Sequence, residues 1–168
     1  MESLEKRLVE LLEEELQVYR EIQAIKHVEG GALISFSARA LEESNRALDS
    51  CVNRASVVEE ERRDVAYRIA KPYWERAGEP TLRDLAPYLS PAIRSKVEVI
   101  AKNLSSVCVE IGRLQFGNTG IIKRSLRYLG ELIEHLLRKA QFPPISYNST
   151  GVLVPGKEAA PGILDRKV

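Results

Sequence analysis

Apolar residues recur along most of the chain at alternating intervals of four and three, the heptad spacing of a helix that packs one face against another helix. The first such segment spans residues 2–34 and has acidic side chains at two positions of its apolar stripe, Glu15 and Glu29. The apolar members of this stripe are Leu4, Leu8, Leu11, Val18, Ile22, Ile25 and Ala32. The sequence Ser35-Phe36-Ser37 follows, and its serines are suited to a turn with capping side chains. We therefore expect the first helix to end near residue 34.

A second helix is expected over residues 38–77, with a stripe that is less apolar than the first. Two polar residues, Asn45 and Arg62, interrupt this stripe. Its apolar members are Leu41, Leu48, Val52, Ala55, Val58, Val65, Ala66 and Ile69. Pro72 is predicted to kink or end the helix, because proline has no backbone donor and clashes with the preceding turn. Gly78, followed by a further proline, ends it near residue 77.

A proline-rich connector precedes the third helix. Thr81 is placed as an N-cap with Asp84 three residues later, which predicts one short helical turn within the connector. Ser90 and Pro91 then indicate a helix start, since a proline at the first helical position loses no hydrogen bond. The third helix is expected over residues 91–141 and has the most regular stripe, made of Ile93, Val97, Ile100, Leu104, Val107, Ile111, Leu114, Asn118, Ile121, Ser125, Tyr128 and Leu132.

These elements predict an all-α fold, an antiparallel three-helix coiled-coil bundle with a long third helix and a flexible C-terminal tail. Short connections make consecutive helices neighbours, so the bundle is assigned residues 1–141. The tail, residues 142–168, is rich in Gly, Pro and Ser and shows no helical or strand periodicity. Because the third helix is longer than its partners, we expect it to project past them, or to bend around them, from about Leu126 onward.

The end of the third helix carries more apolar side chains than one helix seam requires. A second stripe lies beside the first and consists of Ile122, Leu126, Leu129, Ile133 and Leu136, extended by Leu137. A face of this width suits a helix that has two neighbours, and exposed apolar patches of such size normally mark interaction sites. Three coverings remain open: the tail segment 142–153 folding back, a second copy in a homodimer, or a different protein.

Asn118 occupies a core position of the third helix and has two interpretations. A buried polar residue at such a position can fix the register of the helices at some cost in stability. The same residue can instead belong to the binding face of the third helix.

Composition and charge argue against most kinds of chemistry. Twenty-five basic and twenty-four acidic residues leave a formal charge of +1, so no strong field would attract nucleic acid or anionic lipid. The first residues are charged and no window approaches the roughly 20 apolar residues of a membrane span, which predicts a cytoplasmic protein without membrane insertion. The two histidines, His27 and His135, complete no Glu-x-x-His pair of a di-iron bundle. We expect no catalytic residue, no metal and no cofactor.

The third helix and the tail contain sequences specific enough to indicate a family. Residues 115–126, Gln-Phe-Gly-Asn-Thr-Gly-Ile-Ile-Lys-Arg-Ser-Leu, precede a leucine-rich helix, and Tyr147-Asn-Ser-Thr-Gly151 follows in the tail. With Ala32-Leu-Ile before the first break, and Glu60-Glu-Arg-Arg late in the second helix, this pattern resembles the FlgN-like flagellar export chaperones over nearly the whole chain. There are two departures: Gln115 replaces the first of two asparagines, and Gly30-Gly31 replaces the usual pair at the first helix end.

The resemblance implies a non-enzymatic chaperone of the bacterial cytoplasm that serves flagellar type III export. Its implied partners are the flagellar junction proteins, hook-associated proteins 1 and 3, held competent for export, and the flagellar export apparatus. We predict a substrate-binding face made of Asn118, Ile122, Leu126, Leu129, Ile133, Leu136 and Leu137, with Tyr147 and Gly151 from the tail. The alternatives are a structural coiled-coil protein that forms a stable homo-oligomer, and an enzyme or metal protein of bundle fold.

Overall fold

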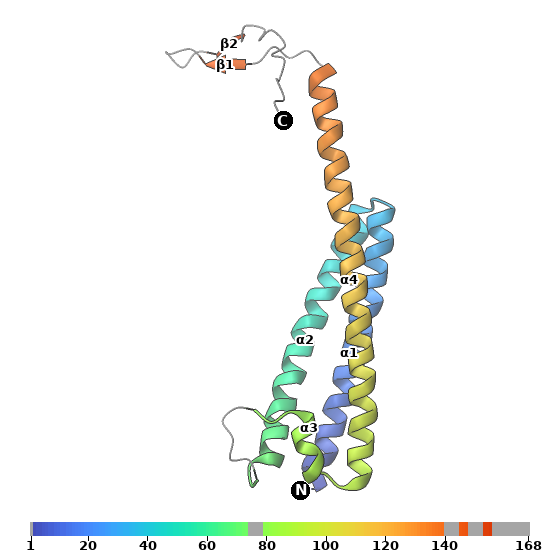
Figure 1. Cartoon of the computed structure of the whole chain (residues 1–168), viewed down its shortest axis with the longest axis vertical. Coiled ribbons are helices and arrows are strands. Elements are labelled where there is room, and N and C mark those ends of the chain that lie inside the picture. Colours follow the sequence, from blue (N-terminus) through green and yellow to red (C-terminus); the bar gives the residue numbers. More distant parts are fainter. Residues whose placement is uncertain (1, 74–78, 140–144, 148–152, 156–168) are drawn as a thin grey trace, which may run out of the picture. The chain divides into compact units, whose positions relative to one another are not determined.

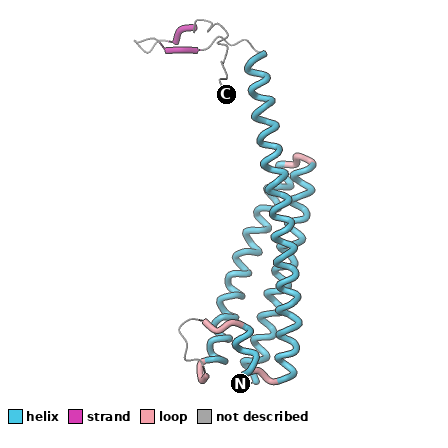
Figure 2. The backbone as a smooth tube through the Cα atoms, in the orientation of Figure 1, coloured by secondary structure: helices cyan, strands magenta, loops and turns pink. Residues whose placement is uncertain are grey.

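The computed structural model describes residues 2–73, 79–139, 145–147 and 153–155. It divides into two compact units, residues 1–122 and 123–168, with the division inside the last helix. The elements are α1 (Glu2–Ile34), α2 (Ala38–Ala70), α3 (Leu82–Leu85), the 3-10 turn η1 (Ala86–Tyr88), α4 (Pro91–Lys139), β1 (Ile145–Tyr147) and β2 (Leu153–Pro155) (Figures 1 and 2). The prediction of a helical protein is confirmed. No helix of the described residues is long and apolar enough to cross a membrane.

The turn between α1 and α2 is built as its sequence indicates. The Ser35 hydroxyl donates to the Gly31 carbonyl at 3.0 Å, and the Ser37 hydroxyl accepts from the Ala40 N–H at the start of α2. Phe36, between the two serines, has a φ of 53°. This left-handed conformation is one that a residue with a Cβ adopts at some cost, and it lets the chain reverse direction within three residues.

The second helix is shorter than expected. α2 ends at Ala70, with the Lys71 N–H donating to the Tyr67 carbonyl, rather than near residue 77. Pro72 accounts for the difference, because it cannot donate the next helical hydrogen bond. In the connector, the Thr81 hydroxyl accepts from the Asp84 N–H and the Asp84 carboxylate accepts from the Thr81 N–H, which is a capping box at the start of α3.

Side-chain contacts within the first unit give the directions of the helices. Arg7 contacts Glu61 at 2.7 Å and Glu21 contacts Arg54 at 2.8 Å, so residue numbers rise along α1 as they fall along α2. Contacts of α4 with α1 join Ser90 to Glu5 and Asn118 to Lys26, so these two helices run in the same direction. The three long helices therefore lie side by side in the first unit (Figure 1).

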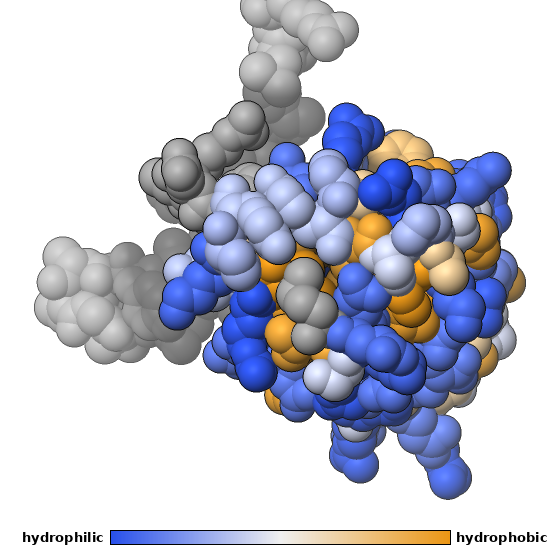
Figure 3. Space-filling view, turned by 90° about the horizontal axis from the view of Figure 1, so that it is seen from below, coloured by the Kyte–Doolittle hydropathy of each residue, from blue (hydrophilic) through white to orange (hydrophobic). Residues whose placement is uncertain are grey.

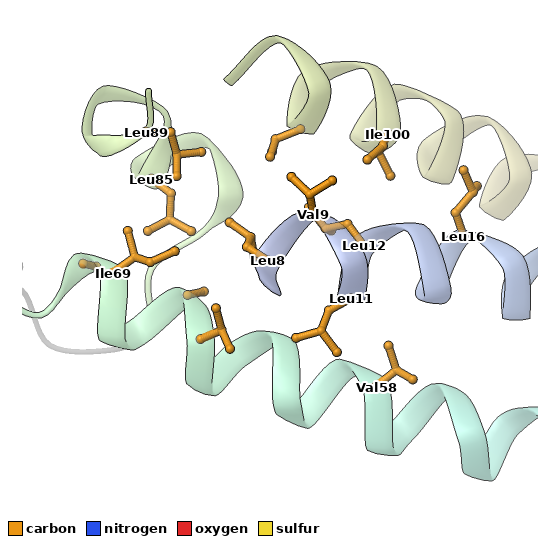
Figure 4. Packing of buried hydrophobic residues seen from close by; sticks show 14 residues of the cluster. Leu8, Val9, Leu11, Leu12, Leu16, Val58, Ile69, Leu85, Leu89 and Ile100 are labelled. Carbon is orange, nitrogen blue, oxygen red and sulfur yellow. The ribbon is translucent and has the colours of Figure 1, made fainter. Parts of the chain in front are cut away.

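The main apolar core lies where the start of α1 meets the end of α2, the connector and the start of α4. Figure 4 shows Leu11 directed toward α2 and Leu8 directed toward Leu85 of the connector, with Leu89 beside Leu85 at one end of the core. Its buried members are Leu8, Val9, Leu11, Leu12, Leu16, Val58, Val65, Ala66, Ile69, Ala70, Leu85, Leu89, Val97 and Ile100. Seen from the end that holds the N-terminus, apolar surface is visible between charged side chains (Figure 3).

A second, smaller core continues along α1 and α2. It consists of Val18, Ile22, Cys51 and Ala55, and among the described residues α4 contributes to it the partly buried Ile111 alone. The helix α4 is therefore less deeply buried here than at its start.

The two strands pair antiparallel, with Tyr147 opposite Leu153 and Ile145 opposite Pro155. These strands were not expected from the sequence of the tail. Three residues in each strand are too few to show the two-residue alternation that marks a strand in a sequence, so the pattern could not indicate them.

Candidate partner-binding surface

The polar residues that interrupt the apolar stripes meet one another inside the first unit. Glu15 of α1 faces Arg62 of α2, with Glu15 Oε2 and Arg62 Nε 2.8 Å apart, and both side chains are largely buried. Burial raises the pKa of the Glu15 carboxyl, and the nearby Arg62 guanidinium acts in the opposite direction. Glu15 and Arg62 therefore form a charge pair across the interface between α1 and α2.

Asn118 joins α4 to α1. Its Nδ2 donates to the Lys26 carbonyl at 3.0 Å and to Glu29 Oε2 at 2.8 Å. The same Glu29 oxygen accepts from Lys26 Nζ at 2.9 Å, in a pair that is itself mostly buried. The Asn118 side chain is buried, and Gly30 leaves the space that its Oδ1 occupies. This geometry is of the kind that fixes helix register, and it directs Asn118 toward α1 rather than toward solvent.

A second polar contact joins the starts of the same two helices. The buried carboxylate of Glu5 accepts from the Ser90 N–H at 3.1 Å and from the Ser90 hydroxyl at 2.8 Å. Ser90 immediately precedes Pro91, the first residue of α4. A carboxylate at this position also interacts favourably with the positive end of the helix dipole. The interface between α1 and α4 therefore has a polar contact at each end and apolar contacts between them.

The predicted apolar face on the last part of α4 is exposed to solvent. We call its five residues in the second unit the leucine face: Leu126, Leu129, Ile133, Leu136 and Leu137. Between 48% and 63% of each of these residues is exposed. Steps of three and four place them on one side of the helix. Tyr128 and Leu132, from the neighbouring stripe, are exposed as well, so this side of the helix is a wide apolar surface.

The other predicted site residues lie elsewhere. Ile122 is the last residue of the first unit and is 40% exposed. Tyr147 lies in β1, and Gly151 lies outside the described residues. Of the predicted binding residues, the five of the leucine face are therefore the ones that lie together on α4 in the second unit.

Some exposed apolar side chains were not indicated by the stripes. Phe116 is 85% exposed, and Val99 and Val109 on the same helix are also exposed. All three lie outside the heptad positions of α4, and a single off-stripe apolar residue gives no signal in a periodicity analysis. Among the described residues, no three His, Cys, Asp or Glu side chains are grouped so that they could hold a metal ion.

Comparison with protein families decides between the classes that the geometry allows. The family model described as FlgN protein matches residues 1–155. The chain belongs to the FlgN family. Members of the FlgN family are flagellar export chaperones and are not enzymes. Comparisons with curated proteins and with solved structures find no match to the chain.

Proposed function

We propose that this FlgN family member binds hook-associated proteins 1 and 3, the flagellar junction proteins, in the bacterial cytoplasm and keeps them competent for type III export. The observation that carries the proposal is the exposed leucine face on a chain of this family. In this proposal the first unit is the predicted antiparallel three-helix coiled coil, and the leucine face in the second unit is the part that binds.

The leucine face can supply a substantial part of the free energy of binding. Complete burial of one leucine or isoleucine side chain is worth about 1.5 to 3 kcal/mol. The five residues are already about half buried, so covering them contributes roughly half of that each, before the cost of association. A helix laid against an apolar helical surface is a recurrent mode of recognition, and a modest affinity allows the partner to be released for export.

An export chaperone needs a binding surface for its partner and no catalytic residues. Junction subunits that assemble through amphipathic helices would associate early if those helices stayed uncovered. The leucine face would take the place of the neighbouring subunit until export, and the flagellar export apparatus would then receive the complex.

Calorimetric titration of the full chain with purified hook-associated proteins 1 and 3 tests the proposal. We expect Leu129→Glu and Ile133→Glu each to weaken binding at least tenfold with unchanged helix content, because a charge replaces an apolar contact. Val99→Glu is the matched control, since Val99 is as exposed as these residues and lies on the same helix in the first unit. Equal binding by all variants, or no binding by the unmodified chain, would overturn the proposal.

A second copy of the chain could also cover the leucine face, as in a stable homo-oligomer. Light scattering measures the molar mass in solution. We expect a monomer of about 18.9 kDa, or a weak dimer that the junction protein dissociates. A tight dimer that excludes the junction protein would favour the structural alternative.

A further inference from the structure

The formal charge of the chain is divided unequally between the two units. Residues 1–122 contain seventeen Lys and Arg against twenty Asp and Glu, a formal charge of −3. Residues 123–168 contain eight against four, a formal charge of +4, and the two values sum to the +1 of the whole chain. The near-neutral total therefore conceals a basic second unit.

Part of this positive charge adjoins the leucine face. Lys123 and Arg127 are four residues apart, so they follow one another along the same side of the helix. Lys123 lies three residues before Leu126, which places it at the edge of the leucine face. Arg124 lies next to this pair, and all three basic residues are exposed. We call these three residues the basic edge.

The basic edge has no acidic partner among the described residues. Arg138, further along the helix, contacts Glu134 at 3.3 Å, which balances both charges. No such contact joins Lys123, Arg124 or Arg127 to a carboxylate in the described part of the chain. Glu131 lies four residues after Arg127. A basic residue that precedes an acidic one at this spacing gives a weaker ion pair on a helix than the reverse order. Three unbalanced positive charges thus border an exposed apolar surface.

We infer that the occupant of the leucine face is an amphipathic helix with acidic side chains along one edge. This inference rests on the proposed function and adds the chemistry of the segment that is bound. Complementary charge at the rim of an apolar interface sets orientation and raises the association rate more than it adds affinity. The basic edge would therefore select which helix binds and in which direction.

Two other occupants fit the charges less well. A second copy would bring its own basic edge to the same interface, and its one described carboxylate outside the Glu134–Arg138 pair in the second unit, Glu131, would face three cations. An anionic membrane prefers helices whose polar side is rich in Lys and Arg. The polar side here includes Glu131 and Glu134, and the chain as a whole has a formal charge of only +1.

A pair of designed peptides tests the inference with the full chain. Both are helices of about 18 residues, five turns, with the same leucine stripe, and the residues flanking the stripe are Glu in one and Lys in the other. Fluorescence anisotropy measures their dissociation constants. We expect the Glu peptide to bind about five to ten times more tightly at about 50 mM salt, and the difference to shrink at about 500 mM salt, where the Debye length is only a few ångströms.

Charge reversal of the basic edge supplies the critical comparison. The triple variant Lys123→Glu, Arg124→Glu, Arg127→Glu should reverse the preference so that the Lys peptide binds more tightly. The matched control changes the chain's charge by the same amount in the first unit, at three exposed residues: Arg20→Glu, Lys96→Glu and Lys102→Glu. This control should keep the preference of the unmodified chain, and circular dichroism should show equal helix content in all three proteins.

The outcomes separate the inference from the proposed function. If both peptides bind equally, and Leu129→Glu weakens both, the leucine face is a binding surface but the acidic partner is wrong. If the control triple also removes the preference, overall charge and not the basic edge is responsible, which overturns the inference. If neither peptide binds, while vesicles containing about one third phosphatidylglycerol do, the surface is a membrane contact and the inference and the proposed function both fail.

Discussion

A Cβ atom at Gly30 would lie 2.9 Å from Oδ1 of Asn118, closer than such atoms approach in folded proteins. The next residue, Gly31, has no atom within 4 Å of the same position. Of the two adjacent glycines in α1, only Gly30 is therefore required by the packing of α4. The Asn118 side chain cannot move away freely, because its Nδ2 is held by Lys26 and Glu29.

The two glycines give a matched pair of substitutions. Gly31→Ala should raise the free energy of unfolding by about 0.5 to 1 kcal/mol, because alanine favours the helix and meets no neighbour. Gly30→Ala should lose this gain and lower the free energy by about 1 kcal/mol, since Asn118 must give up at least one hydrogen bond. Urea denaturation of both variants measures the difference. Equal stabilisation by both would show that Asn118 adapts without cost.

The contact of Glu5 with Ser90 should also contribute to stability. In Glu5→Ala the N–H and hydroxyl of the exposed Ser90 lose their acceptor and can turn to water instead, so we expect the free energy of unfolding to fall by about 1 kcal/mol. Glu2→Ala is the control, because Glu2 is exposed and pairs with Lys6 in the i, i+4 arrangement, a kind of pair worth little. Chemical denaturation followed by circular dichroism gives both values. A loss no greater than that of the control would contradict the role of Glu5.

The pair Glu15 and Arg62 should behave as a buried charge pair. Arg62→Leu leaves the Glu15 carboxylate buried without its cation, and we expect a loss of about 3 kcal/mol. The double variant Glu15→Leu, Arg62→Leu should recover most of this loss, since two apolar residues need no compensation. Denaturant titrations of the single and double variants form a double-mutant cycle. Losses that simply add would mean that the two residues do not interact.

The raised pKa of Glu15 also predicts a dependence on pH. Between the pKa of the unfolded chain and the higher pKa of the folded protein, the folded protein keeps a proton that the unfolded chain has released. The contribution of Glu15 to stability is therefore present below the unfolded pKa and is lost as the pH rises through the folded pKa. The stability difference between the unmodified chain and Glu15→Gln, measured from about pH 4 to 7, should accordingly fall with rising pH. A difference that rises would show that pairing with Arg62 outweighs burial.

The regular part of the fold could be predicted from the sequence because it depends on local rules. Heptad stripes indicate long helices wherever three or four consecutive repeats agree, and α1 begins and ends at the residues expected. The end of α2 was placed too late, at residue 77 rather than at Ala70. Pro72 predicts either a kink or an end, and Gly78 favours an end near residue 77; the sequence pattern alone does not decide between these two positions.

The partners of the polar interruptions could not be predicted from the sequence. Glu15, Glu29, Arg62 and Asn118 each appeared as a separate weakness in a stripe, because a periodicity analysis treats one helix at a time. Which of these residues meet depends on how the three helices are rotated about their axes. That rotation is determined by side-chain contacts between residues far apart in the sequence. For the candidate surface, the sequence indicated which residues are apolar, and only the coordinates gave the extent of their exposure.

The spacing of the two polar contacts of α4 restricts how the gene can change in length. Ser90 and Asn118 are 28 residues apart, which corresponds to four heptads. Deleting a single residue between them would rotate Asn118 by about 100° away from Glu29 while Ser90 stayed in place. Insertions and deletions in this stretch should therefore be tolerated only as whole heptads, matched by an equal change in α1 between Glu5 and Lys26.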